Sequence, residues 1–170
     1  MNKIFGIGLA KTATSSLARA MSILNFKSKH YLFDVENDLK KYEFLNDMPI
    51  QTRYKQYDSK YSNSKFILTI RDEESWLKSV QKQFLKHRRP KNSLLYNNWV
   101  EQFGFFGSNK EKLLQRYRSH NFEVKEYFKQ RNDFLIMDIF SGDKWEKLCS
   151  FLNLRIPEVD FPHLNKSNLD

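Results

Sequence analysis

The first sixteen residues constrain the fold most strongly, because they place a strand, a tight turn and a helix start in immediate succession. Residues 3–8 form a short apolar segment that predicts a strand, and residues 14–25 carry apolar side chains at helical spacing. A glycine-punctuated turn joins them. Backbone N–H groups at the start of such a helix are unpaired, and the helix dipole adds positive charge there. The segment therefore predicts an anion-binding site.

The turn and the start of the helix are rich in groups that bind anions. Lys11 supplies a positive charge, and the hydroxyl groups of residues 12 and 14–16 supply hydrogen-bond donors. The segment is not a Walker A loop, which has its lysine directly after the second glycine of G-x-x-x-x-G-K-[ST]. Because Lys11 follows Gly8 by three residues, ATP and GTP are disfavoured as ligands. We predict a phosphate or sulfate group at the N-terminus of this helix.

Length and composition predict one domain over residues 1–170 with a core of ordinary size. No apolar run approaches the roughly 18 residues of a membrane span, and no signal-peptide core is visible. The one cysteine, Cys149, excludes an internal disulfide framework and predicts a reducing, cytoplasmic compartment. The net charge of +9 predicts attraction to polyanions, without choosing among nucleic acid, nucleotide and acidic glycan.

Strands and helices alternate along the rest of the chain. We expect strands at 44–47, 65–70 and 134–139, helices at 50–60, 73–86, 109–130 and 143–152, and an extended tail at 155–165. The runs 65–70 and 134–139 are typical of strands buried on both faces of a parallel sheet. The alternation predicts a three-layer α/β/α fold with a central parallel sheet. Because ligands bind beyond the carboxyl ends of such strands, the segment 8–15, Asp47 and Arg71 should converge.

Arg71 and Ser79 form a second candidate anion site. Arg71 follows the strand 65–70, and Ser79 lies eight residues later, two turns into the next helix. An arginine fork and a hydroxyl group at these places would hold a terminal phosphate. The alternative is that Arg71 pairs with Asp72 or Glu74 and that Ser79 is merely solvated.

Four motifs follow one another along nearly the whole chain. They are K-T-A-T-S-S-L at 11–17, the strand 66–70 with Arg71-Asp72 and Ser79, Y-R-S-H-N-F-E-V-K-E-Y-F at 117–128, and W-E-K-L-C-S-F-L at 145–152 with Pro157 and F-P-H-L-N at 161–165. In this order they resemble the sulfotransferases that use 3′-phosphoadenosine 5′-phosphosulfate (PAPS). The first motif of that family reads K-T-G-T-T-S-L, so this chain has Ala13 in place of glycine. If that position needs a positive φ, alanine costs about 1 kcal/mol there.

The resemblance implies a P-loop-NTPase-like topology for the α/β/α fold. It also implies an enzyme that moves a sulfuryl group from PAPS to a hydroxyl group or amine of an acceptor. It implies that the backbone of residues 11–16 cradles the 5′-phosphosulfate, that Lys11 neutralises the leaving oxygen, and that Arg71 and Ser79 bind the 3′-phosphate. The residues expected at the nucleotide are Lys11, Thr12, Ala13, Thr14, Ser15, Ser16, Arg71, Ser79, His120 and Asn165. No metal ion is expected, because no triphosphate has to be offset by magnesium and no Cys or His pair has metal-ligand spacing.

Asp47 is the candidate general base, because an Asp-x-Pro follows a strand near the sulfonate in this branch of the family. The alternative is an N-cap for a helix with Pro49 at its first position. His120 lies on an apolar helix stripe, so a packed histidine bonded to backbone competes with a cofactor contact. His163 and Asn165 either close over the nucleotide or lock the tail.

Three questions stay open at this point. The basic run 86–91 either recognises an anionic acceptor or the 3′-phosphate, or forms a solvated loop. A P-loop nucleotide kinase, with Asp138 as a Walker B-like aspartate, is one alternative function, and a non-catalytic basic module for nucleotide or nucleic acid is another. The acceptor and the oligomeric state are not specified.

Overall fold

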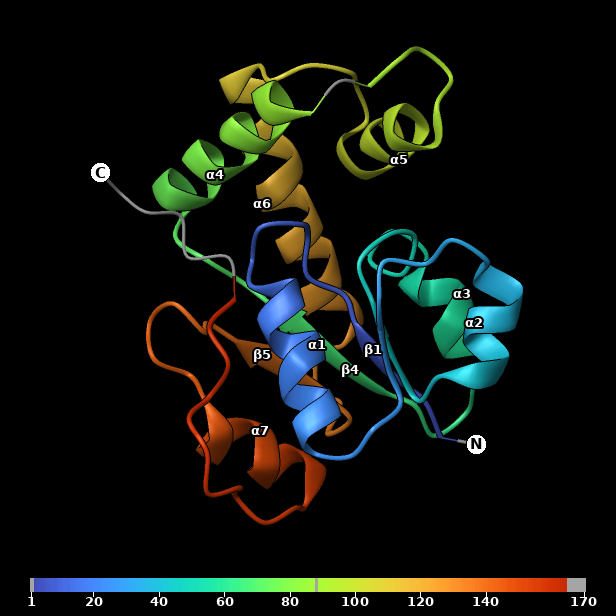
Figure 1. Cartoon of the computed structure of the whole chain (residues 1–170), viewed down its shortest axis with the longest axis vertical. Helices are drawn as coiled ribbons and strands as arrows, with labels where there is room; N and C mark the ends of the chain where they lie inside the picture. The colour runs from blue at the N-terminus through green and yellow to red at the C-terminus, as the bar shows by residue number, and fades with distance from the viewer. Residues whose placement is uncertain (1, 88, 165–170) are drawn as a thin grey trace.

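The computed structural model describes residues 2–87 and 89–164, and a parallel sheet forms its centre (Figure 1). The five strands of this part are β1 (Ile4–Gly6), β2 (Ser28–His30), β3 (Phe44–Asn46), β4 (Lys65–Thr69) and β5 (Phe134–Met137). Every pairing is parallel and the order is β2-β3-β1-β4-β5. The predicted parallel sheet is confirmed, and β1, which leads into the anion-binding turn, lies at its centre.

Helices cover both faces of the sheet (Figure 1). They are α1 (Thr14–Ile23), α2 (Val35–Lys41), α3 (Tyr54–Lys60), α4 (Glu73–Lys86), α5 (Leu94–Phe103), α6 (Lys110–Tyr127) and α7 (Trp145–Leu152). Successive strand residues point to opposite faces, so Ile67 packs with α1 and α7 whereas Phe66 packs with α3 and α6. The three-layer prediction is confirmed. No helix in the described residues is long and apolar enough to cross a membrane.

A third cluster of apolar side chains lies beyond the carboxyl ends of the strands, where α4, α5 and α6 meet. Trp76 of α4 is fully buried there and stacks on Tyr117 of α6, with ring centroids 4.2 Å apart. Its indole Nε1 donates to the carbonyl of Ala10 at 3.0 Å. This packing therefore holds α4 against the turn that precedes α1.

Three elements were not predicted from the sequence, and two predicted elements differ from those in the structure. β2, α2 and α5 were not expected, and β2 in particular consists of half-buried polar residues at the sheet edge, which give no apolar signal. The strand predicted at 134–139 ends at Met137 and is less buried than expected, since its first three residues are half-buried although they pack on both faces of the sheet. The helix predicted at 50–60 begins only at Tyr54, so Pro49 is not its first residue.

Candidate active site

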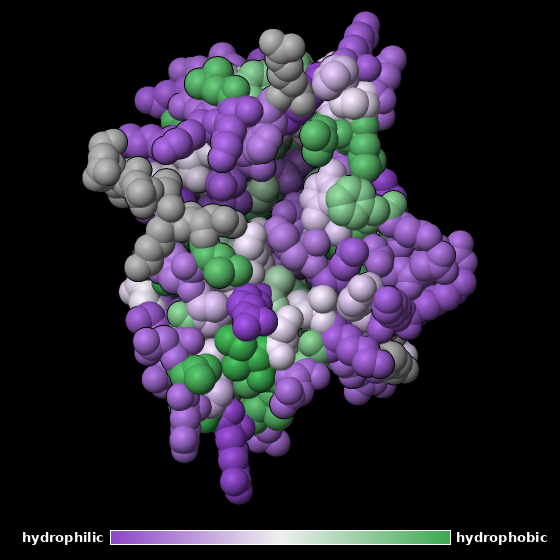
Figure 2. Space-filling model, viewed as in Figure 1, coloured by the Kyte–Doolittle hydropathy of each residue, from purple (hydrophilic) through white to green (hydrophobic). Residues whose placement is uncertain are grey.

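A cleft of about 660 Å³ opens beyond the carboxyl ends of β1, β3 and β4. Its walls carry Ala10, Lys11, Ala13, Thr14, Ser15, His30, Asp47, Arg71, Ser79, Lys82, Gln83, Lys86, His87, Phe140 and Leu164. Figure 2 shows a hollow in this part of the surface, with hydrophilic residues gathered on the side of α4. The predicted convergence of the first turn, Asp47 and Arg71 is confirmed.

The start of α1 is built to receive an anion. Ala13 is its N-cap, makes no side-chain capping hydrogen bond, and no acidic residue follows in the first turn. Such a bond is also missing at α3 and α7, whereas α2, α4, α5 and α6 each begin with a side chain that accepts from a backbone amide. Lys11 and Ala13 both have positive φ, 74° and 71°, so Ala13 carries the strain that the glycine of the family pattern avoids. An anion bound here would take the place of the missing cap.

The turn is held against the end of β4 by a contact between hydroxyl groups and by close packing at Gly8. Thr12 Oγ1 donates to the carbonyl of Leu9 at 2.7 Å and lies 2.7 Å from Thr69 Oγ1. A Cβ added to Gly8 would come within 2.1 Å of that same Thr69 oxygen, so only glycine fits. Thr12 is fully buried and does not line the cleft, which means that its hydroxyl group shapes the turn instead of facing a ligand.

Lys11 extends into the cleft without an acidic partner. Within residues 2–87 and 89–164, none of the ion pairs includes Lys11 or Arg71. Partial burial lowers the pKa of the Lys11 ammonium and the positive charge of Arg71 lowers it further, while the Asp47 carboxylate on the opposite wall raises it in part. The pKa of Lys11 stays lowered despite Asp47, so an anion bound in the cleft would further favour the charged form of its ammonium group.

Arg71 is held rigidly at the end of β4. Its backbone amide donates to the Tyr117 hydroxyl group at 2.8 Å, and that hydroxyl donates to the Arg71 carbonyl at 2.6 Å. Its Nε donates to Ser75 Oγ at 2.6 Å, and its guanidinium lies over the Phe140 ring, 3.9 Å from the centroid. These contacts place the guanidinium at the cleft wall. Ser79, which lies two turns into α4, lines the same cleft.

The alternative pairing of Arg71 with its acidic neighbours does not occur. Asp72 is the N-cap of α4 and accepts from the Ser75 amide at 2.9 Å. Glu74 pairs with Lys78 at 2.7 Å on the outer side of the same helix. Both carboxylates therefore contact residues of α4 and form no ion pair with Arg71.

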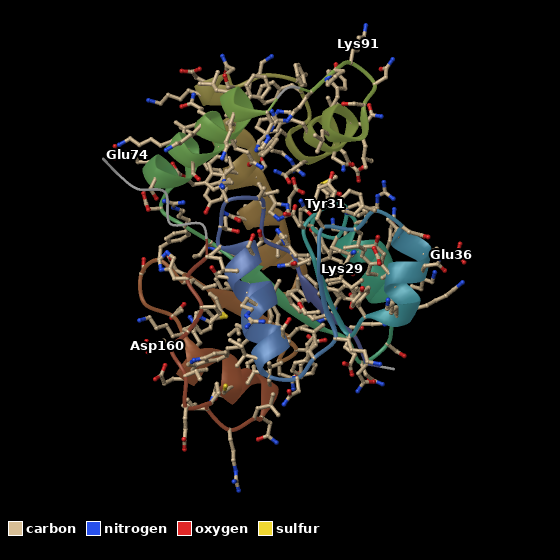
Figure 3. The ribbon with its side chains drawn as sticks, in the orientation of Figure 1. Lys29, Tyr31, Glu36, Glu74, Lys91 and Asp160 are labelled. Atoms are coloured by element: carbon tan, nitrogen blue, oxygen red, sulfur yellow. The ribbon has the colours of Figure 1, made fainter. Side chains whose placement is uncertain are left out.

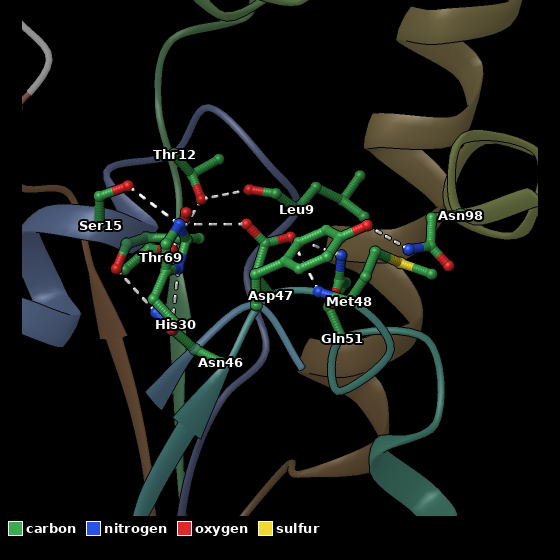
Figure 4. A network of polar contacts seen from close by, with 12 residues as sticks. Leu9, Thr12, Ser15, His30, Asn46, Asp47, Met48, Gln51, Thr69 and Asn98 are labelled. Carbon is green, nitrogen blue, oxygen red and sulfur yellow. Dashed lines mark hydrogen bonds and ion pairs between the residues drawn. The ribbon is translucent and has the colours of Figure 1, made fainter. Parts of the chain in front are cut away.

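Asp47 lies on the opposite wall, directly after β3. The N-cap interpretation is wrong, because the N-cap of α3 is Arg53. Instead Oδ1 of Asp47 accepts from the Met48 amide at 2.8 Å, and the Gln51 side-chain amide lies 3.4 Å from the same oxygen. Asp47 itself adopts a positive φ of 69°. These contacts turn the other carboxylate oxygen, Oδ2, toward His30 of β2 (Figure 4).

The hydrogen bonds around His30 define which ring nitrogen faces the cleft as an acceptor. The Asn46 amide nitrogen donates to the Thr14 carbonyl at 2.7 Å, so its oxygen is the atom that lies 3.1 Å from His30 Nδ1. Nδ1 must then carry the proton in the neutral ring. Nε2 is left as an acceptor, 3.0 Å from Ser15 Oγ and 3.5 Å from Asp47 Oδ2. A proton that arrives at either Nε2 or Oδ2 would be shared between them.

Several residues expected at the nucleotide lie elsewhere. His120 is 1% exposed, its Nε2 lies 2.8 Å from the Ile7 carbonyl, and burial lowers its pKa to about 4, so its assignment as a cofactor contact is wrong. Ser16 is buried and accepts from the Leu164 amide at 3.0 Å, so its side chain anchors the tail. Asp138, the Walker B-like residue of the alternative kinase function, accepts from the Ser141 amide at 3.1 Å and does not line the cleft. Asn165 lies outside the described residues.

The sequence interpretation named Ser79 and the basic run that begins at Lys86, but it missed Lys82 and Gln83, which line the cleft between them. Ser79, Lys82, Gln83 and Lys86 recur at helical spacing, which was the available signal. The basic run 86–91 is divided: Lys86 and His87 line the cleft. Arg89 instead donates to the carbonyls of Phe84 and His87, both at 2.8 Å, and closes the end of α4. His30 was missed because a three-residue polar edge strand gives no pattern.

Comparison with known proteins agrees with this geometry. Residues 32–169 match the family model described as a sulfotransferase domain, a range that starts after the turn containing Lys11. The chain is also similar to the Ava biosynthesis cluster protein M of Aspergillus versicolor, with 22% identity over 218 aligned positions that cover 98% of this chain and 82% of that protein. Because the family model matches more than half of the residues of this chain, the chain belongs to the sulfotransferase domain family.

Proposed function

We propose that this protein transfers a sulfuryl group from PAPS to a hydroxyl group or amine of an acceptor. The observation that carries the proposal is the placement, in one cleft, of an uncapped helix N-terminus, two cations that form no ion pair in the described part of the chain, and an Asp–His pair. The anion-binding groups suit a nucleotide with phosphate and sulfonate groups, and the pair suits proton removal.

The nucleotide fits along one half of the cleft. The amides at the start of α1 and the Lys11 ammonium would hold the 5′-phosphosulfate, while Arg71 and Ser79 would hold the 3′-phosphate. PAPS, when bound, supplies an activated sulfuryl group with a phosphate as its leaving group. Lys11 would offset the charge that builds on the bridging oxygen, which is where electrostatic help is most effective in such a transfer.

Proton removal falls to the opposite wall. The acceptor oxygen forms a bond to sulfur as the bond from sulfur to the 5′-phosphate oxygen breaks, and the products are the sulfate ester and adenosine 3′,5′-bisphosphate. The hydroxyl proton passes to Asp47 Oδ2 or His30 Nε2, which lie 3.5 Å apart and can share it. Because Met48 and Asn46 fix these two side chains, both are oriented before the substrates bind.

Replacement of Lys11 tests the proposal. Lys11→Ala should lower the rate of adenosine 3′,5′-bisphosphate formation about 100-fold or more, because it removes a charge needed in the transition state. Lys78→Ala is the matched control, since that lysine pairs with Glu74 on the outer side of α4 and should leave the rate unchanged. A normal rate in Lys11→Ala would refute the assignment of this turn.

A further inference from the structure

The wall of the cleft that α4 provides carries more positive charge than the nucleotide contacts described above use. Lys82 and Lys86 both line the cleft, one and two turns beyond Ser79. Within the described residues, neither takes part in an ion pair. Lys78 of the same helix points outward and is paired with Glu74 at 2.7 Å. On α4, the lysine outside the cleft is thus paired with a carboxylate, whereas the two lysines that line the cleft form no ion pair within the described residues.

The two lysines lie toward the end of the cleft that holds the Asp–His pair. The rise of a helix places Lys86 about 10 Å along α4 from Ser79, away from the end that follows Arg71. This end of α4 packs on α5, where the rings of Phe84 and Trp99 are 4.9 Å apart. In Figure 1, α4 runs from the end of β4 toward α5.

α5 in turn is fastened to the segments that carry the Asp–His pair. Gln51 donates to Gln102 of α5 at 2.7 Å and lies beside Asp47. Asn98 of α5 donates to the hydroxyl group of Tyr31, the residue after His30, and Figure 3 shows Tyr31 between the sheet and α5. Lys86 and the Asp–His pair therefore flank the same end of the cleft, and the charge of Lys86 also acts on Lys11, whose pKa it lowers.

A neutral acceptor would leave the ammonium groups of Lys82 and Lys86 side by side on one face of α4, in a partly enclosed space. Like charges repel there more strongly than in bulk water, and a carboxylate or phosphate on the acceptor would offset that repulsion. The opposite wall supplies Asp47, which would repel an anion, so the anionic group has to lie on the α4 side and the nucleophile on the Asp47 side. The charges fix an orientation as well as a class of substrate.

We infer that the acceptor is a hydroxyl compound with an anionic substituent, a carboxylate or phosphate, which Lys82 and Lys86 bind while the hydroxyl group faces Asp47 and His30. The inference rests on the proposed sulfotransferase function and adds the chemical class of the second substrate.

The test compares matched acceptors that differ in charge. The pairs are 4-hydroxyphenylacetate with 4-hydroxyphenylacetamide, and glucose 6-phosphate with glucose, each assayed with PAPS for kcat/KM and titrated into protein saturated with adenosine 3′,5′-bisphosphate. The anionic member of at least one pair should be preferred about tenfold or more, as expected for charge-assisted hydrogen bonds. The double variant Lys82→Gln/Lys86→Gln should bring that preference close to parity, whereas Lys78→Gln should retain it.

Affinity for adenosine 3′,5′-bisphosphate separates this inference from the proposed function. If Lys82 and Lys86 serve the acceptor, the double variant should bind the bisphosphate within about threefold of the unaltered protein. A loss of bisphosphate affinity with an unchanged preference among acceptors would overturn the inference and make both lysines nucleotide ligands. Equal turnover or equal binding within both pairs by the unaltered protein would also overturn it. Failure of the unaltered protein to bind the bisphosphate would instead contradict the proposed function.

Discussion

Lowering the pH from 8 to 5 should destabilise this protein by about 2 kcal/mol through His120 alone. The side chain is 1% exposed and lies between α6 and the carbonyl of Ile7 at the end of β1. Burial lowers its pKa from 6.5 to about 4. Because the folded state resists protonation, the unfolded chain takes up its proton first as the pH falls. The contribution of His120 to the free energy of unfolding is therefore fully present above pH 6.5 and is lost progressively as the pH falls to 4.

The size of the effect follows from the two pKa values. A difference of 2.5 units corresponds to about 3.4 kcal/mol when the full range has been crossed, and the fraction lost by pH 5 is about 2 kcal/mol. Other groups titrate over the same range, so the useful quantity is the difference between the protein and a variant that lacks the imidazole. His120→Gln removes the titration and keeps an amide that can donate to Ile7.

The measurement is urea unfolding followed by tryptophan fluorescence at pH 8, 7, 6 and 5. The stability advantage of the unaltered protein over His120→Gln should shrink by about 2 kcal/mol between pH 8 and pH 5. Parallel decline of the protein and His120→Gln would show that the imidazole is not buried and neutral.

Three further predictions concern the turn and the base. Ala13→Gly should raise the free energy of unfolding by about 0.5–1 kcal/mol, because glycine tolerates the φ of 71° and caps a helix better than alanine, and lower stability in urea unfolding would contradict it. Gly8→Ala should cost about 1–3 kcal/mol through contact with Thr69, and an unchanged melting temperature would exclude the close approach described here. Asp47→Asn should lower kcat by about 100-fold while the dissociation constant of adenosine 3′,5′-bisphosphate changes little, and a selective loss of nucleotide affinity would show that Asp47 is not part of the base.

The sequence predicted the elements whose residues carry both an apolar pattern and a function. β4 and α4 were placed to within a residue, because a continuous apolar run followed by an acidic N-cap and a helical stripe allows few other structures. The sequence left the backbone angle of Ala13 open, because alanine at a position usually held by glycine does not by itself show whether φ is positive.

What the sequence did not show depends on contacts between distant segments. His30 acquires its role through Asn46 and Asp47, which lie on the neighbouring strand, so no local spacing could mark it. His120 matches the family motif and sits on an apolar stripe, and only its contact with Ile7 shows that it belongs to the core. The lysines that line the cleft had a readable helical spacing, but solvated helix faces carry the same pattern.

The most direct test of the central claim is thermal unfolding in the presence of adenosine 3′,5′-bisphosphate, compared with adenosine 5′-monophosphate and with ATP plus magnesium. At 100 times its dissociation constant, a ligand of the folded state should add about 2.7 kcal/mol of stability. The account predicts a shift of this size with the 3′,5′-bisphosphate, unaffected by magnesium and much reduced in Arg71→Ala. Stabilisation by magnesium and ATP with none by the 3′,5′-bisphosphate would contradict it.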